Sequence, residues 1–186
     1  MNNPLRILQC LDRNLTHPAE LTVFGRAALA LGFPAAPAAF SATQDVDAIL
    51  PLGWLEAEER NSDFWEAQQK TNAELEGTGL YITHLFRELE IILTPDWITR
   101  RMPLGLPLVK LAVYRPAAVD LILSKMARGD DNDLADIRFL LNQERCTVEQ
   151  LRKAFHDARV PEVPEIRQLF RAAQPRVLAL VDQPTV

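Results

Sequence analysis

Two aspartates separated by one residue, Asp45 and Asp47, form the pair in this sequence whose spacing most directly suggests chemistry. Side chains alternate along a strand with a period of two, so both carboxylates would point to one face while Val46 points to the other. Neighbouring like charges repel, and a divalent cation relieves that repulsion. Magnesium is commonly held by one or two carboxylates together with substrate phosphates. The pair therefore predicts a magnesium site, and a solvated aspartate pair at a strand end or turn is the alternative.

A second candidate site lies about twenty residues upstream, where a strand predicted over residues 21–24 runs into Gly25 and a short helix. A helix that begins in this way offers backbone N–H groups and a positive dipole end to a phosphate. Glycine suits this position because it has no Cβ to hold the phosphate away. The next residue, Arg26, could bind phosphate through its two-pronged guanidinium, or its bulk could block a nucleotide.

The second half of the chain places one lysine, Lys125, in an apolar helical stretch that several acids follow. A lysine in such a setting either extends to water or meets a partner. Asp136 could be that partner, and it lies three residues after Asp133, on the same helix face. Arg128 could add to a positive field around phosphates. Ion pairing and phosphate contact both stay open for Lys125.

A third carboxylate could come from Glu90. Glu88 and Glu90 alternate with apolar residues in a strand predicted over residues 88–93, so the two glutamates would share a face. A solvated polar face on an edge strand is the alternative.

Three blocks of this sequence, residues 25–29, 43–47 and 120–136, resemble the nucleotidyltransferase superfamily in their order and spacing. The similarity is greatest to uncharacterised bacterial members allied to the AbiEii-type toxins of toxin–antitoxin and phage-defence systems. It implies a polymerase-beta-like fold in which Asp45 and Asp47 hold Mg²⁺ as catalytic residues. It implies further catalytic roles for Lys125, at the γ-phosphate, and Glu90. The residues that it implies to bind the nucleotide are Gly25, Arg26, Thr43, Arg128 and Asp136.

The resemblance also implies a reaction, in which a nucleoside monophosphate passes from an NTP to a hydroxyl group and pyrophosphate leaves. The implied acceptor is an RNA 3′ end or a protein side chain, and the implied protein partner is a toxin or an antitoxin. The superfamily usually has Gly-Ser or Gly-Gly at the phosphate turn, where this chain has Gly25-Arg26. A catalytically inactive, antitoxin-like binding protein of the same fold is therefore the alternative function. A plain α+β interaction protein with a coincidental aspartate pair is a third.

The apolar spacing and the proline and glycine breaks predict an α+β fold with a helical C-terminal half. We expect helices over 4–14, 27–31 and part of 54–75, a loop over 32–40, and strands over 21–24, 45–50, 80–86, 88–93 and 108–114. A loop should cover 97–107. Four helices should follow residue 116, one opened by a Thr147–Gln150 capping box and the last broken or kinked at Pro175. These elements predict a nucleotidyltransferase-like core over 1–115 and a helical segment over 116–186 that packs on it.

Composition limits the class of protein. The sequence has 186 residues, of which 48% are apolar and 24% charged, with a formal net charge of −5. These values are ordinary for a soluble globular protein, and they provide no broad basic footprint for nucleic acid. No apolar run approaches the length of a membrane span, and the N-terminal residues lack the pattern of a signal peptide. We therefore expect a cytoplasmic protein without a membrane partner.

Overall fold

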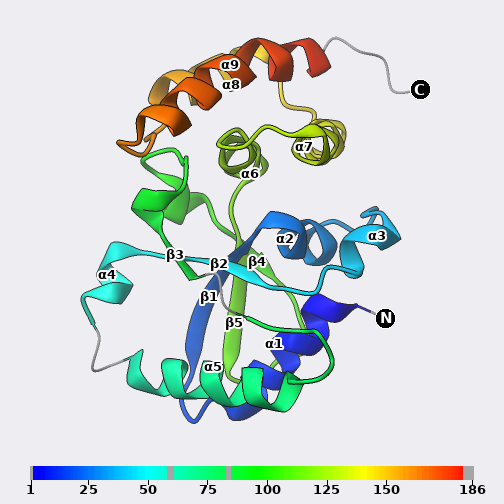
Figure 1. Ribbon diagram of the computed structural model, residues 1–186, viewed down its shortest axis with the longest axis vertical. Coiled ribbons are helices and arrows are strands. Elements are labelled where there is room, and N and C mark those ends of the chain that lie inside the picture. The colour runs from blue at the N-terminus through cyan, green and yellow to red at the C-terminus, as the bar shows by residue number, and fades with distance from the viewer. Residues whose placement is uncertain (1, 58–60, 83–84, 182–186) are drawn as a thin grey trace. The chain divides into compact units, whose positions relative to one another are not determined.

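The structure is a computed structural model that describes residues 2–57, 61–82 and 85–181 (Figure 1). The chain forms two compact units. The first comprises Met1–Glu88 and Arg101–Arg115, and the second comprises Leu89–Arg100 and Pro116–Val186. The first unit holds a mixed sheet with helices and the second is helical, so the predicted α+β class is confirmed.

The sheet of the first unit has five strands in the order β3-β2-β1-β5-β4. The strand β1 pairs antiparallel with β2 and parallel with β5. At the edges, β3 pairs parallel with β2 and β4 pairs antiparallel with β5. The strands are β1 (Ala19–Phe24), β2 (Asp47–Leu50), β3 (Leu85–Arg87), β4 (Met102–Leu104) and β5 (Leu111–Arg115).

The two faces of this sheet carry different sets of residues. One face carries side chains such as Val23 and Ala48, both with no exposed surface, and these belong to the apolar core. On the other face Phe24 lies opposite Asp47, and Thr22 lies opposite both Ile49 and Tyr114. We call this second face the Asp47 face.

The helices of the first unit are α1 (Asn3–Asn14), α2 (Gly25–Gly32), α3 (Ala38–Ser41), α4 (Leu52–Leu55) and α5 (Ser62–Leu75). Helix α1 packs against α5, α2 and β5, and α2 packs against β1. The α1 helix begins where the side chain of Asn2 accepts a hydrogen bond from the backbone N–H of Leu5, at 3.0 Å. Its Ile7, Leu8 and Leu11 are fully buried at helical spacing, so apolar burial fixes its orientation.

A buried carboxylate joins α1 to the start of β5. Oδ1 of Asp12 accepts hydrogen bonds from the backbone N–H groups of Lys110 at 2.7 Å and Leu111 at 2.8 Å. A third N–H, that of Val109, donates to the same carboxylate at 3.1 Å. Burial acts to raise the pKa of Asp12, but the three backbone hydrogen bonds together lower it below its ordinary value.

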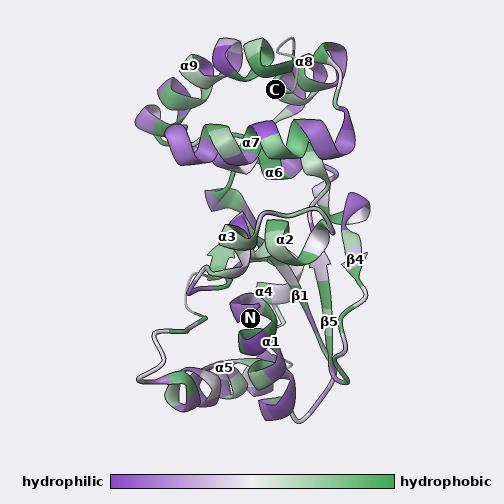
Figure 2. Ribbon diagram, turned by 90° about the vertical axis from the view of Figure 1, so that its right-hand side faces the viewer, coloured by the Kyte–Doolittle hydropathy of each residue, from purple (hydrophilic) through white to green (hydrophobic). Residues whose placement is uncertain are grey.

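The second unit consists mainly of four helices, α6 (Ala118–Lys125), α7 (Asp131–Glu144), α8 (Val148–Asp157) and α9 (Pro164–Val181). Hydrophilic and hydrophobic residues alternate around α7 and α9, as expected for helices with one buried side (Figure 2). The predicted capping box is confirmed, because Thr147 and Gln150 each accept a hydrogen bond from the other's backbone N–H. The helix α9 continues through Pro175, so the described helix is not broken there, and the alternative of a kink stays a prediction.

Several predicted element boundaries were wrong. Residues 88–90 form a 3₁₀ turn, so the predicted strand over 88–93 is absent from the described residues and β3 has no hairpin partner there. The loops predicted over 97–107 and 32–40 contain β4 and most of α3, respectively. Residues 83–84 of the strand predicted over 80–86 lie outside the described residues. Within the described part of the chain, no helix has both the length and the apolar character of a membrane span.

Candidate functional site

The turn from β1 into α2 brings Gly25 against a carboxylate of the Asp47 face. Gly25 has a φ of +62°, in the left-handed region that glycine tolerates best. A Cβ at this position would lie 3.2 Å from Oδ2 of Asp47. The beginning of α2 and the aspartate at the start of β2 therefore lie within contact distance, and only a residue without a side chain fits comfortably between them.

Asp45 lies just before β2 and is held by its neighbours. The hydroxyl of Thr43 donates a hydrogen bond of 2.7 Å to Oδ1 of Asp45. The backbone of Asp45 forms an isolated parallel bridge with Tyr81. Val46 is fully buried whereas Asp45 and Asp47 are each half-buried. The alternation predicted from the sequence therefore holds, although β2 starts at Asp47 rather than at Asp45.

Arg26 follows Gly25 and turns toward an aromatic ring. The carbon at the centre of its guanidinium lies 5.8 Å from the ring centre of Phe40, which belongs to α3. This separation is within the range of a cation–π interaction. Phosphate binding and steric obstruction by Arg26 both stay predictions.

The donor set of the aspartate pair fits a magnesium ion that shares its ligands with a phosphate. Magnesium is typically bound by one or two carboxylates, with phosphate oxygens and water completing its shell. Across residues 2–57, 61–82 and 85–181, no group of three or more His, Cys, Asp or Glu side chains is placed to hold a metal ion. The strand beside β2 contributes Leu85, Phe86 and Arg87, none of them acidic. Two carboxylates therefore fit an ion whose remaining ligands come from outside these side chains.

In the second unit, Lys125 is part of a buried ion pair. Its Nζ lies 2.6 Å from Oδ2 of Asp136 and 3.5 Å from Oδ1 of Asp133, and at most 7% of each of these side chains is exposed. Arg128 donates to Asp133 from Nε at 2.9 Å, and this hydrogen bond raises the pKa of the arginine. The ion pair that the sequence left open for Lys125 is therefore present, and the predicted γ-phosphate contact stays a prediction.

Glu90 does not lie on a strand. It ends the 3₁₀ turn over Glu88–Glu90 and its side chain is exposed. Glu88 instead accepts a hydrogen bond from the backbone N–H of Leu52, at 2.9 Å. The shared strand face that suggested Glu90 as a third carboxylate is therefore absent here, and its catalytic role stays a prediction.

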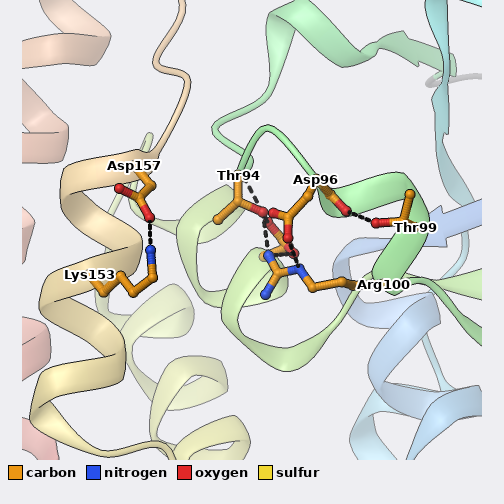
Figure 3. Close-up of polar contacts among 7 residues, drawn as sticks. Thr94, Asp96, Thr99, Arg100, Lys153 and Asp157 are labelled. Carbon is orange, nitrogen blue, oxygen red and sulfur yellow. Dashed lines mark hydrogen bonds and ion pairs between the residues drawn. The ribbon is translucent and has the colours of Figure 1, made fainter.

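The second unit contains a polar cluster whose contacts the sequence did not reveal (Figure 3). It lies beside a cavity of about 640 Å³. Asp120 has no exposed surface. Its carboxylate accepts hydrogen bonds from the N–H and hydroxyl of Thr94, each at 2.8 Å, and from Arg100 at 3.0 Å. Burial raises the pKa of Asp120, and these hydrogen bonds only partly offset that effect. The only signal in the sequence was that Asp120 opens the third block of the superfamily resemblance.

A second residue that the sequence analysis missed, Arg101, lies on the Asp47 face of the first unit. Its Nη1 donates to the hydroxyl of Thr22 at 3.1 Å, and its Nη2 lies 3.2 Å from Oε2 of Glu20. The guanidinium carbon lies 4.3 Å from the ring centre of Tyr114. No sequence pattern links Arg101 to these partners, because Glu20 and Thr22 precede it by about eighty positions.

Comparison with known proteins agrees with the predicted superfamily. A family model described as "Nucleotidyltransferase of unknown function (DUF6036)" matches residues 6–169, which is most of the chain. No curated protein and no solved structure matches the sequence. The predicted kinship with AbiEii-type toxins stays a prediction.

Proposed function

This chain belongs to the family of nucleotidyltransferases of unknown function, and on that premise we propose that it transfers a nucleoside monophosphate from a magnesium-bound NTP to a hydroxyl group. The observation that carries the proposal is the contact between Gly25 and Asp47 in the first unit. It places a helix start without a side chain, suited to a phosphate, beside an aspartate suited to the magnesium that accompanies that phosphate.

Each residue of this arrangement has a proposed role. Gly25 lets phosphate oxygens approach the first backbone N–H groups of α2. Asp45 and Asp47 would hold Mg²⁺, and Thr43 fixes one carboxylate oxygen of Asp45 through its hydroxyl. When bound, the ion supplies positive charge that neutralises phosphate oxygens and favours departure of pyrophosphate. Held in this way, the two aspartates would position the ion, and the phosphates bound to it, beside the turn at Gly25.

The proposed acceptor follows the resemblance to the toxin group. We propose the hydroxyl of an RNA 3′ end or of a protein side chain, and a role within a toxin–antitoxin or defence system. A catalytically inactive binding protein of the same fold is the second candidate. It is favoured by the acid-free strand β3 and by the buried pairing of Lys125 with Asp136.

Calorimetric titration with ATP, GTP, CTP and UTP, with and without Mg²⁺, tests the proposal. We expect at least one nucleotide to bind only when magnesium is present. The isosteric variants Asp45→Asn and Asp47→Asn should each lose that binding because they remove the negative charge that holds the ion. The exposed Asp131 in the first turn of α7 provides the matched control, since Asp131→Asn should bind like the wild type.

Label transfer then separates the two candidates. The protein is incubated with the NTP that binds, radiolabelled at the α-phosphate, together with cellular RNA and protein. Label that becomes attached to RNA or protein supports the transferase, provided that Asp45→Asn abolishes it. Magnesium-dependent binding without transfer supports the inactive binding protein, and a wild type that binds none of the four nucleotides overturns the proposal.

A further inference from the structure

We propose that Arg101 binds a phosphate group of the nucleotide and that Glu20 competes with that phosphate for the guanidinium. This inference rests on the proposed function, since it assigns a further ligand of the same nucleotide. It concerns the first unit only, and every residue that carries it lies on the Asp47 face.

Strand register relates the hydrogen-bond partner of Arg101 to the position of Asp47. Phe24 lies opposite Asp47, and Thr22, the hydrogen-bond partner of Arg101, is two residues away on β1. Two residues of a strand span about 7 Å. Arg101 and the Gly25–Asp47 contact therefore lie on the same face of the sheet, at neighbouring positions along β1. The sheet face thus presents two carboxylates for an ion and one guanidinium for the phosphates around it.

Two of the contacts of Arg101 hold its guanidinium in place. The ring of Tyr114 stacks against the guanidinium at 4.3 Å, and the hydroxyl of Thr22 accepts a hydrogen bond from Nη1. Only 17% of the Arg101 side chain is exposed. Arginine has a planar fork of donors, so a stacked arginine loses little further freedom when it binds a second group.

A further contact of Arg101, with Glu20, is one that a ligand can replace. The Glu20 side chain is 56% exposed, and ion pairs in water contribute little to stability. A guanidinium binds phosphate through charge-assisted hydrogen bonds that are about twice as strong as neutral ones. A phosphate can therefore displace Glu20 while Thr22 and Tyr114 keep the arginine oriented. Glu20 occupies the anion position in the absence of nucleotide.

This exchange gives two variants with effects of opposite sign on nucleotide binding. Glu20→Gln removes the competing charge, so the affinity for the magnesium–nucleotide complex should rise about threefold. Arg101→Lys keeps the charge but loses the planar fork, so the affinity should fall about tenfold. If Arg101 were only a clamp between strands, Glu20→Gln would leave the affinity unchanged or lower it.

Calorimetry with the nucleotide that the wild type binds measures these affinities, and thermal unfolding of each variant checks that it is folded. Glu74→Gln is the matched control, because it breaks a comparable exposed ion pair, Arg13–Glu74 at 3.3 Å, between α1 and α5. It should bind like the wild type. If Arg101→Lys fails to fold, the sign of the change in affinity in Glu20→Gln still tests whether Glu20 competes with phosphate.

The outcomes distinguish this inference from the proposed function. If the wild type binds no nucleotide, both are overturned. If the wild type binds and Glu20→Gln does not bind more tightly than Glu74→Gln, the role of Arg101 is overturned while the proposed function stands. A higher affinity in Glu20→Gln, with a lower affinity in any folded Arg101→Lys, supports the competition.

Discussion

At the scale of single residues, the site depends on an absent side chain as much as on the carboxylates. The left-handed backbone of Gly25 lets β1 turn directly into α2, and the missing Cβ leaves room for Asp47. Both requirements fall on one position, so a methyl group there would disturb the backbone and the carboxylate together.

The substitution Gly25→Ala should therefore reduce both stability and nucleotide binding. We expect a loss of about 1–2 kcal/mol in the free energy of unfolding, which is the cost of a left-handed residue that carries a Cβ. Nucleotide affinity should fall further because the new Cβ would press on Oδ2 of Asp47. Urea denaturation and calorimetry measure the two effects.

Gly53 provides the control for that substitution. It lies in α4, and a Cβ there would meet nothing within 4 Å. Gly53→Ala should leave nucleotide binding unchanged and raise stability by up to about 1 kcal/mol, since alanine is the better helix former. If Gly25→Ala behaved like Gly53→Ala in both measurements, the contact with Asp47 would have no functional meaning.

Local spacing made some of the site residues predictable and left others hidden. The alternation of Asp45, Val46 and Asp47 and the position of Gly25 between a strand and a helix are short-range patterns, and the structure contains both. Arg101 and Asp120 were not predictable because their partners are distant in sequence. Arg101 pairs with Glu20, and Asp120 pairs with Arg100. A single sequence holds no signal for contacts of that kind.

At the scale of elements, the wrongly predicted strand over 88–93 shows how burial overrides a local pattern. Glu88 and Glu90 alternate with apolar residues as in a strand, yet Leu89 is 53% exposed. The three residues that follow, Ile91, Ile92 and Leu93, are all buried in succession. A half-buried strand would alternate buried and exposed side chains, so the exposed Leu89 and the consecutive burial of 91–93 do not fit one. Residues Glu88–Glu90 form a 3₁₀ turn instead. Helices with strong caps were predicted closely, since α1 was predicted within one residue and α8 begins at its predicted Thr147 cap.

The pairing of α6 with α7 yields a prediction at this scale. Replacing Lys125 by Met should lower the free energy of unfolding by about 3–5 kcal/mol, because Asp136 would keep a buried charge without its cation. The double variant Lys125→Met/Asp136→Leu should recover much of that loss, since no charge is then stranded. Chemical denaturation of the three proteins at pH 7 provides the comparison.

Lys153→Met serves as the control for the buried lysine. Its partner Asp157 is in the same helix, and 79% of the Lys153 side chain is exposed. Its loss should cost no more than about 1 kcal/mol. Equal costs for Lys125→Met and Lys153→Met would mean that the buried pair contributes little to the packing of α6 on α7.

At the scale of the whole molecule, the two units are interleaved along the chain. The first unit is interrupted by Leu89–Arg100, which groups with the second. Leu93 forms a backbone bridge with Arg159, and Thr94 binds Asp120, so this segment is tied to helices that come much later in sequence. The sequence predicted a division after residue 115. No short-range pattern marks Leu89–Arg100 as part of the second unit.

A fragment that ends at residue 115 should consequently be poorly soluble. It would retain Ile92, Leu93 and Trp97, which have at most 1% exposure in the full chain, without the helices of their own unit. We expect fragment 1–115 to aggregate in size-exclusion chromatography. The same fragment with residues 89–100 replaced by a Gly/Ser linker of equal length should remain more soluble. Equal solubility of the two fragments would show that residues 89–100 do not need the helices of the second unit to stay soluble.

The parallel pairing of β1 with β5 has a consequence for how this protein is made. The strand β1 ends at Phe24, but its parallel neighbour does not begin until Leu111. During synthesis on the ribosome, the edge of β1 that pairs with β5 therefore stays unpaired until most of the polypeptide has emerged. Strand pairings between residues this distant in sequence form slowly, and an unpaired strand edge binds chaperones or other copies of the chain. The rate of synthesis through residues 89–110 thus determines how long the edge of β1 stays unpaired in the nascent chain.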